Sequence, residues 1–197
     1  DGTRVAIGAY NNDSNGEDSG HVRVWEWQDG TSSWVKLGQD IEGETPGDHS
    51  GWSVALSADG TRVAIGAYGL DGEDLGHARV WEWQDGTSSW VQLGQDIKGE
   101  ATDDYSGWSV ALSADGTRVA IGAFGNDENG KNSGHVRVWE LQGEASSWVQ
   151  LGQDIDGEAA GDKLGISVSL SADGTRVAIG AHGNDGNGKK SGHVRIW

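Results

Sequence analysis

One eleven-residue segment recurs along the chain and constrains its fold more than any other feature. Residues 57–67 have the sequence SADGTRVAIGA, which returns at residues 113–123 and 171–181. Its last nine residues also open the chain, at residues 1–9. Copies at fixed spacing are typical of a repeat protein, whose units pack on their neighbours instead of each burying a core of its own. The sequence therefore predicts stacked units of 56 to 58 residues.

Each unit contains four short runs in which apolar residues alternate with small or polar ones. Alternation with a period of two, bounded by Gly and Asp, is typical of β-strands, and no window has the 3.6-residue period of a helix. The pair Asp59-Gly60 predicts a tight hairpin turn, because both residues tolerate a positive φ. Four antiparallel strands, joined by hairpins and repeated, are typical of a propeller blade. We expect an all-β propeller with small-residue strands at the hub and Trp-rich strands farther out.

The phase of the repeat divides the 197 residues into two complete blades and two partial ones. The partial blades lack strands, so this division predicts fourteen strands in total. We expect the cut blades to be completed by further blades of the same protein or by another chain. The predicted units are a partial blade at 1–50, complete blades at 51–106 and 107–164, and a partial blade at 165–197.

The chain is acidic, with a formal net charge of −17, and contains no cysteine. The charge disfavours nucleic-acid partners, because a protein that binds phosphates needs Lys and Arg to neutralise them. No apolar run approaches the roughly 18 residues of a membrane span, so we expect no membrane insertion. The lack of cysteine excludes a disulfide framework, a Cys-ligated zinc site and a thiol nucleophile.

The loop after each copy of the repeated segment carries the candidate metal ligands. In the first unit Asn11, Asp13 and Asn15 alternate and Gly16 follows, as in the first half of a calcium-binding loop. The third and fourth units keep part of the pattern, at Asp127, Asn129, Asp185 and Asn187. No acid stands at the twelfth position in any copy, and such residues also form ordinary turns. Calcium binding and simple turn formation are therefore both open interpretations of these loops.

Tryptophan, arginine and histidine recur at fixed positions of the unit, which favours structural roles for them. The chain has 11 Trp, and a platform for sugars is one interpretation, but positions shared between units are typical of blade packing. The arginines occupy two repeat positions, so we expect cross-strand or inter-blade ion pairs. One histidine opens the third strand of each unit; these histidines lie on different blades, and we interpret them as structural. They are His21, His77, His135 and His193.

Several runs of the second unit together resemble a known repeat. Residues 50–56 (SGWSVAL), the Asp59-Gly60 turn, residues 64–67 (AIGA) and residues 76–81 (GHARVW) resemble the FG-GAP repeat. That repeat builds the seven-bladed propeller at the N-terminus of integrin α chains and of related bacterial and algal surface proteins. The resemblance implies an extracellular or cell-surface location. The last residue of the family's Gly-Ala-Pro is replaced here by Tyr10, Tyr68, Phe124 and His182.

The family often holds calcium in a long acidic loop between the first two strands of a blade. This chain has only residues 58–61 there, too few to surround a cation, so we do not expect the family's calcium site. No nucleophile elbow, phosphate-binding glycine loop or metalloprotease motif is present. Near-identical units also lack the different residues that catalysis brings to one point, which predicts that the chain is not an enzyme.

We therefore expect a non-enzymatic structural, adhesion or recognition module that acts outside the cell. The alternative is a carbohydrate-binding, lectin-like propeller with glycans as partners and one weak site in each blade, whose repetition adds avidity. Calcium is the one cofactor that the loops indicate. The sequence singles out no ligand-binding residue.

Overall fold

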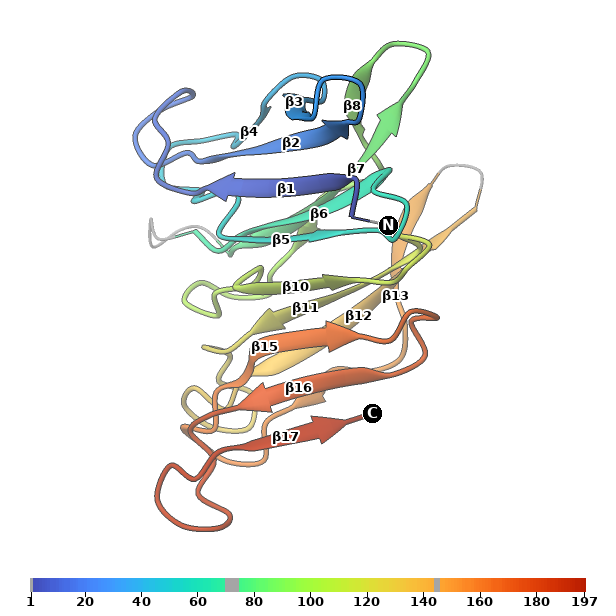
Figure 1. Cartoon of the computed structure of the whole chain (residues 1–197). Coiled ribbons are helices and arrows are strands. Elements are labelled where there is room, and N and C mark those ends of the chain that lie inside the picture. The colour runs from blue at the N-terminus through green and yellow to red at the C-terminus, as the bar shows by residue number, and fades with distance from the viewer. Residues whose placement is uncertain (1, 70–74, 144–145) are drawn as a thin grey trace.

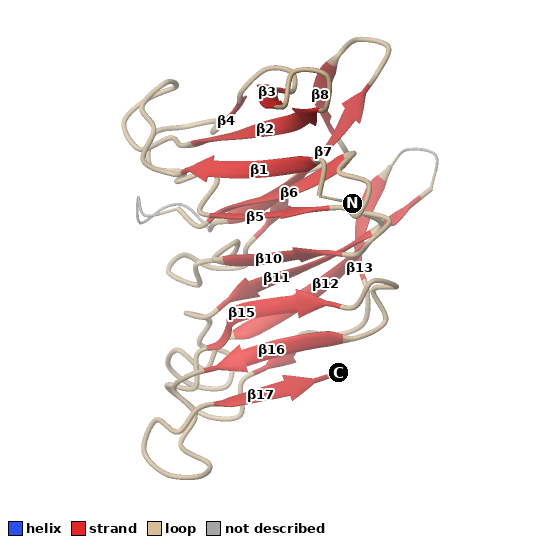
Figure 2. Cartoon of the chain, in the orientation of Figure 1, coloured by secondary structure: helices blue, strands red, loops and turns tan. Residues whose placement is uncertain are grey.

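The structure, a computed structural model, describes residues 2–69, 75–143 and 146–197 (Figure 1). These residues form strands, turns and loops, and none of them forms a helix (Figure 2). A helix long and apolar enough to cross a membrane is accordingly missing from the described part of the chain. The all-β class predicted from the period-two alternation is confirmed.

Four antiparallel sheets follow one another along the chain, and successive strands are neighbours except for the last strand of each of the first three sheets. The first sheet consists of β1 (Arg4–Ala9), β2 (His21–Gln28), β3 (Ser33–Lys36) and β4 (Ile41–Glu42). The second consists of β5 (Ser53–Leu56), β6 (Arg62–Ala67), β7 (His77–Gln84), β8 (Ser89–Gln92) and β9 (Ile97–Lys98). The third consists of β10 (Ser109–Leu112), β11 (Arg118–Ala123), β12 (His135–Gln142), β13 (Ser147–Gln150) and β14 (Ile155–Asp156). The fourth consists of β15 (Leu164–Leu170), β16 (Val177–Ala181) and β17 (His193–Ile196).

Three of the sheets contain a short strand that the sequence did not predict. β4, β9 and β14 are two residues long and pair with the first residues of β2, β7 and β12. The segment before β4 interrupts the pairing, because Gly38 has a φ of +76° that extended backbone does not adopt. The described residues therefore form seventeen strands instead of the expected fourteen. The count was wrong because the outermost strand of a sheet pairs in two pieces.

The sheets stack in chain order, and the innermost strands of neighbouring sheets contact each other (Figure 1). Glycine in the repeated AIGA segment permits this close approach. A Cβ atom on Gly66 would lie 2.0 Å from the carbonyl oxygen of Gly107 in the next sheet, and one on Gly122 would lie 2.1 Å from that of Gly165. The most repeated segment of the sequence thus forms an inner hairpin, and its close contact with the following sheet requires glycine in the AIGA segment.

Tryptophans on the outer strands join neighbouring sheets. The indole nitrogen of Trp148 in β13 donates a hydrogen bond to the carbonyl oxygen of Leu93 in the second sheet at 2.8 Å. The side chain of Gln95 bonds both backbone groups of Trp148. Trp90 in β8 makes the same contacts with the first sheet. Both indoles are 2% exposed, so the predicted packing role is confirmed for them, whereas Trp34 at the same repeat position of the first sheet is 43% exposed.

Among the described residues, seven of the eight arginines make the predicted ion pairs, in two directions, and Arg176 does not. Arg118 in β11 pairs with Glu140 of the adjacent strand at 2.7 Å and donates to the carbonyl oxygen of Gly174 in the following sheet. Arg137 in β12 pairs with Glu100, which belongs to the loop after the preceding sheet, at 3.2 Å. Cross-strand and inter-sheet pairing are both confirmed, and together they fix how neighbouring sheets are placed.

Candidate functional site

The long loops that follow β1, β11 and β16 leave the stack at one end, and β6 ends on the same side (Figure 1). We call this end the loop end. Three positions of the repeat meet there. In the second sheet they are Tyr68, directly after β6, Trp52, directly before β5, and His49, three residues before Trp52. Because the sheets stack, each of these positions lies beside its counterparts in the neighbouring sheets.

Aromatic side chains at these positions form a continuous row across the first three sheets. The ring centroids of Trp52 and Trp108 are 4.5 Å apart, and Trp108 lies edge-on to Phe124 at 4.7 Å. At one end Tyr10 lies edge-on to Trp52 at 4.8 Å, and at the other Tyr105 stacks on Phe124 at 5.1 Å. We define the aromatic row as Tyr10, Trp52, Tyr68, Tyr105, Trp108 and Phe124.

The row is partly open to solvent. Tyr10 is 38% exposed, and Trp52, Trp108 and Tyr105 are half-buried. Tyr68 is buried, and this burial raises the pKa of its phenol above the usual value, so the hydroxyl keeps its proton near pH 7. The row thus combines aromatic rings with hydroxyl groups that can donate and accept hydrogen bonds.

The fourth sheet ends the row. At the three corresponding positions it has Lys163, Ile166 and His182. The earlier units have aromatic residues at these positions, except that His49 stands at the first of them in one unit. The Lys163 ammonium group lies 5.2 Å from the centroid of the Phe124 ring, a cation–π distance. The units are nearly uniform in their strands and diverge at the loop end.

A buried polar contact positions the loops that carry the last aromatic pair. Asn126 donates a hydrogen bond to Asp104 at 2.9 Å, and both side chains are buried. Burial raises the pKa of the Asp104 carboxyl above its ordinary value. Asp104 directly precedes Tyr105, and Asn126 follows Phe124 by two residues, so this bond holds the two stacked rings in register.

The predicted calcium ligands make contacts within and between their loops. Asp13 accepts a hydrogen bond from the amide five residues later at 2.9 Å, and Asp127 and Asp185 do the same at 2.7 and 2.6 Å. Asn15 and Asn129 donate to the carbonyl oxygens of glycines that follow β4 and β14. Asn11 and Asn187 are exposed. The bonds to the aspartates are those of turn formation, those from Asn15 and Asn129 join two loops, and calcium binding at these residues stays a prediction.

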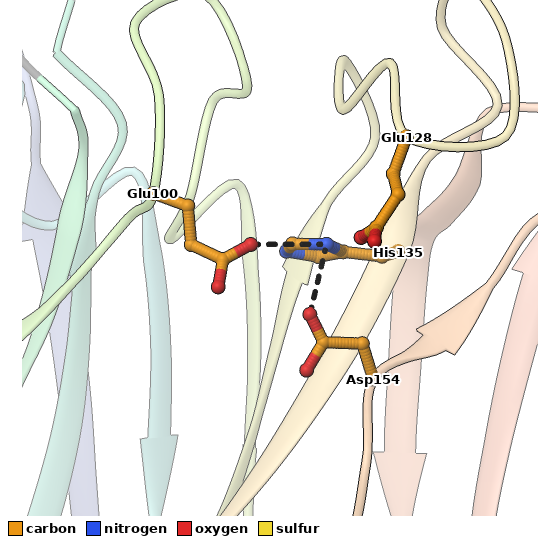
Figure 3. Close-up of side chains that lie close together, drawn as sticks. All are labelled: Glu100, Glu128, His135 and Asp154. Atoms are coloured by element: carbon orange, nitrogen blue, oxygen red, sulfur yellow. Dashed lines mark ion pairs between the residues drawn. The ribbon is translucent and has the colours of Figure 1, made fainter.

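A separate group of metal-ligating side chains lies at the loop end, where β12 begins. Single ligand atoms of its four members all lie within 4.8 Å of one another (Figure 3). Burial lowers the pKa of the central histidine to about 4, so its imidazole is neutral near pH 7. The group comprises Glu100, Glu128, His135 and Asp154, and a smaller one in the first sheet comprises His21, Asp40 and Glu42.

Sequence reasoning missed both the aromatic row and this group. The repeated position of the histidines indicates a structural role, whereas His135 lies among carboxylates, including one from the preceding sheet. A signal was present, because acids stand 19 and 21 residues after both His21 and His135. For the row, the signal was the replacement of the family's Pro by an aromatic residue in three of the four units.

Solved structures with a similar fold share little sequence with this chain. A periplasmic gluconolactonase from Pseudomonas aeruginosa matches with a TM-score of 0.55 and 17% identity, over 97% of this chain and 54% of that one. A putative 6-phosphogluconolactonase from Bacteroides fragilis matches with a TM-score of 0.50 and 13% identity, over 81% and 40%. U3-55K matches with a TM-score of 0.50 and 18% identity, over 88% and 48%. The chain therefore spans about half the length of these structures, and the likeness shows the fold.

These neighbours correct one expectation. Near-identical units predicted that the chain is not an enzyme, but proteins with this fold include a gluconolactonase, which is an enzyme, and a putative 6-phosphogluconolactonase. That prediction is wrong, because a fold built from repeated blades does not by itself exclude catalysis. The prediction also assumed that the units are nearly identical, but the loops of the fourth sheet differ from the others at the loop end, where a ligand has access.

The repeat itself is identified by its family model. No protein among the curated sequences matches the chain. The model of the FG-GAP repeat matches residues 98–139 and 155–196, segments that run from the end of one sheet through three strands of the next. The resemblance and the β-propeller class inferred from the sequence are both confirmed: the fold is that of a β-propeller, and residues 98–139 and 155–196 are FG-GAP repeats.

Proposed function

We propose that this chain is the recognition module of an extracellular or cell-surface propeller, and that the aromatic row binds carbohydrate. The row itself carries this proposal. Pyranose rings present C–H faces that pack on aromatic side chains, and their hydroxyl groups need hydrogen-bond partners at the edge of the contact. Tyr10 and Tyr105 supply phenol hydroxyls at the two ends of the row.

The placement of the row supports an extended ligand. Its rings come from three successive sheets, and neighbouring centroids are 4.5 to 5.1 Å apart along the path from Tyr10 through Trp52, Trp108 and Phe124 to Tyr105. An oligosaccharide that lies along the row contacts several rings at once, which raises its affinity above that of a single sugar. Loops at one end of a rigid scaffold are also where binding residues of repeat folds concentrate.

A glycan array probed with the labelled chain tests the proposal. We expect binding to a subset of oligosaccharides, and we expect Tyr10→Ala and Trp108→Ala each to lower the affinity for the best-bound glycan about 10-fold or more, because they remove aromatic anchors. Tyr10 is 38% exposed, so its replacement leaves the packed sheets intact.

The matched control is Trp34→Ala, which removes an exposed tryptophan outside the row. It should leave the affinity unchanged. An array without binding, or an equal loss of affinity in Trp34→Ala, would show that the row does not bind carbohydrate.

A further inference from the structure

His135 lies at a junction where two sheets contribute ligating side chains (Figure 3). It is the first residue of β12, Asp154 directly precedes β14, and Glu128 belongs to the loop between β11 and β12. Glu100 comes from the loop after β9, in the preceding sheet. In Figure 3 the three carboxylates surround the imidazole ring. The contact between the second and third sheets thus creates this arrangement, which neither sheet has alone.

The imidazole carries an unused ligand atom. His135 is 1% exposed, and its Nδ1 has no hydrogen-bond partner among the described residues. The nearest carboxylate oxygens are those of Asp154 at 3.7 Å and Glu100 at 3.9 Å, which is too far for a hydrogen bond. A buried polar atom left without a partner destabilises the folded chain. These distances of 3.7 and 3.9 Å match the distance between two ligand atoms on one ion. That distance is roughly 3.4 to 4.2 Å when each metal–ligand bond is about 2.1 Å.

The charge of the group also calls for a cation. Three carboxylates converge, and Arg137 pairs with one of them, Glu100, at 3.2 Å. Asp156, whose backbone pairs with that of His135, adds another buried carboxylate oxygen without a hydrogen bond in the described part of the chain. Like charges held this close repel one another unless a positive charge lies between them.

We propose that His135 and the three carboxylates around it bind one divalent first-row transition-metal ion between the second and third sheets. Imidazole nitrogen favours Zn²⁺ and its neighbours, while carboxylate oxygen also suits Mn²⁺ and Ca²⁺, so the mixed set favours Zn²⁺ or Mn²⁺ over Ca²⁺. The carboxylates of Glu100 and Glu128 belong to exposed residues, which gives the ion a path from solvent. Because its ligands come from both sheets, the ion cross-links them and stabilises the folded chain.

The other units explain why we expect one strong site in this chain. In the first sheet, Asp40 already pairs with Arg23 at 2.8 Å and with Lys36 at 2.7 Å, so its charge is satisfied. In the second sheet, Lys98 stands at the position of Asp156, and its ammonium group disfavours a bound cation. In the third sheet Glu100 pairs with Arg137, but among the described residues neither Asp154 nor Glu128 pairs with an arginine or a lysine.

Isothermal titration of the whole chain with Zn²⁺ and with Mn²⁺ tests the proposal. We expect saturable binding of one ion per chain and an increase in the melting temperature. Asp154→Asn and Glu128→Gln should each weaken binding on the order of 100-fold, since the loss of a supporting residue alone costs 10- to 100-fold. Pulsed electron paramagnetic resonance of the Mn²⁺ complex should show coupling to an imidazole nitrogen.

The matched control is Asp96→Asn, at the same repeat position in the second sheet. Asp96 accepts a hydrogen bond from Gln92 as Asp154 does from Gln150, so both substitutions remove the same structural contact. Asp96→Asn should leave the affinity unchanged. The proposal is overturned if neither ion binds saturably, if Asp96→Asn weakens binding as much as Asp154→Asn, or if bound Mn²⁺ shows no nitrogen coupling.

Discussion

Replacing Trp148 with alanine should lower the free energy of unfolding by about 3–5 kcal/mol, the usual cost of emptying a buried tryptophan site. Trp148 is 2% exposed and packs in the cluster that joins the second and third sheets. Its indole also donates to the carbonyl oxygen of Leu93 in the neighbouring sheet, and the substitution leaves that partly buried oxygen without this bond. Unfolding in guanidinium chloride, followed by tryptophan fluorescence and circular dichroism, measures the change.

Trp34 provides the control, because it occupies the same position of the repeat without a preceding sheet in the described chain. It is 43% exposed, and its ring lies 5.5 Å from Trp27 of its own sheet. Trp34→Ala should cost less than about 1 kcal/mol, as surface substitutions usually do. Equal costs for the two substitutions would show that Trp148 does not join the sheets.

Replacing Gly122 with alanine should cost about 3 kcal/mol, at the upper end of what overpacking costs. The added methyl group would lie 2.1 Å from the carbonyl oxygen of Gly165, which is backbone of the following sheet and cannot rotate away. The sheets must separate to accept it, and this separation weakens the contact between them. The same denaturant titration measures the loss.

Gly180 is the counterpart of Gly122 in the fourth sheet. A methyl group there meets the hydroxyl of Ser167 at 2.4 Å, just as one on Gly122 meets the hydroxyl of Ser109 at 2.5 Å. The carbonyl oxygen of a following sheet is the contact that the two positions do not share. Gly180→Ala should therefore cost under about 1 kcal/mol, and a cost equal to that of Gly122→Ala would contradict the role given to the AIGA segment.

The strands and turns could be predicted because their signals are local. Alternation in residues 63–67 sets a strand, and Gly60 adopts the positive φ of 68° that the Asp-Gly turn indicates. The fixed spacing of Arg118 and Glu140 places them opposite each other in adjacent strands. The split outer strand escaped prediction because two residues such as Ile41–Glu42 are too few to show a period.

The candidate sites could not be predicted, because they depend on which loops meet between sheets. Trp52 and Trp108 are 56 residues apart in sequence, and Glu100 precedes His135 by 35 residues. Period-two alternation fixes the face of a strand but does not state which side chains of the next sheet lie beside it. A constant place in the repeat indicates packing, which holds for Trp148 but does not reveal the buried nitrogen of His135 that has no hydrogen bond among the described residues.

Both sites depend on the face-to-face stacking of the sheets, and the exchange of indole protons with solvent tests that stacking most directly. Nuclear magnetic resonance of the chain labelled with ¹⁵N-tryptophan resolves each indole N–H. Stacked sheets predict slow exchange for Trp90 and Trp148, whose indole nitrogens donate across sheet boundaries at 2.9 and 2.8 Å, and fast exchange for Trp34. Fast exchange at all three tryptophans would contradict the stacking, and with it the aromatic row and the metal site.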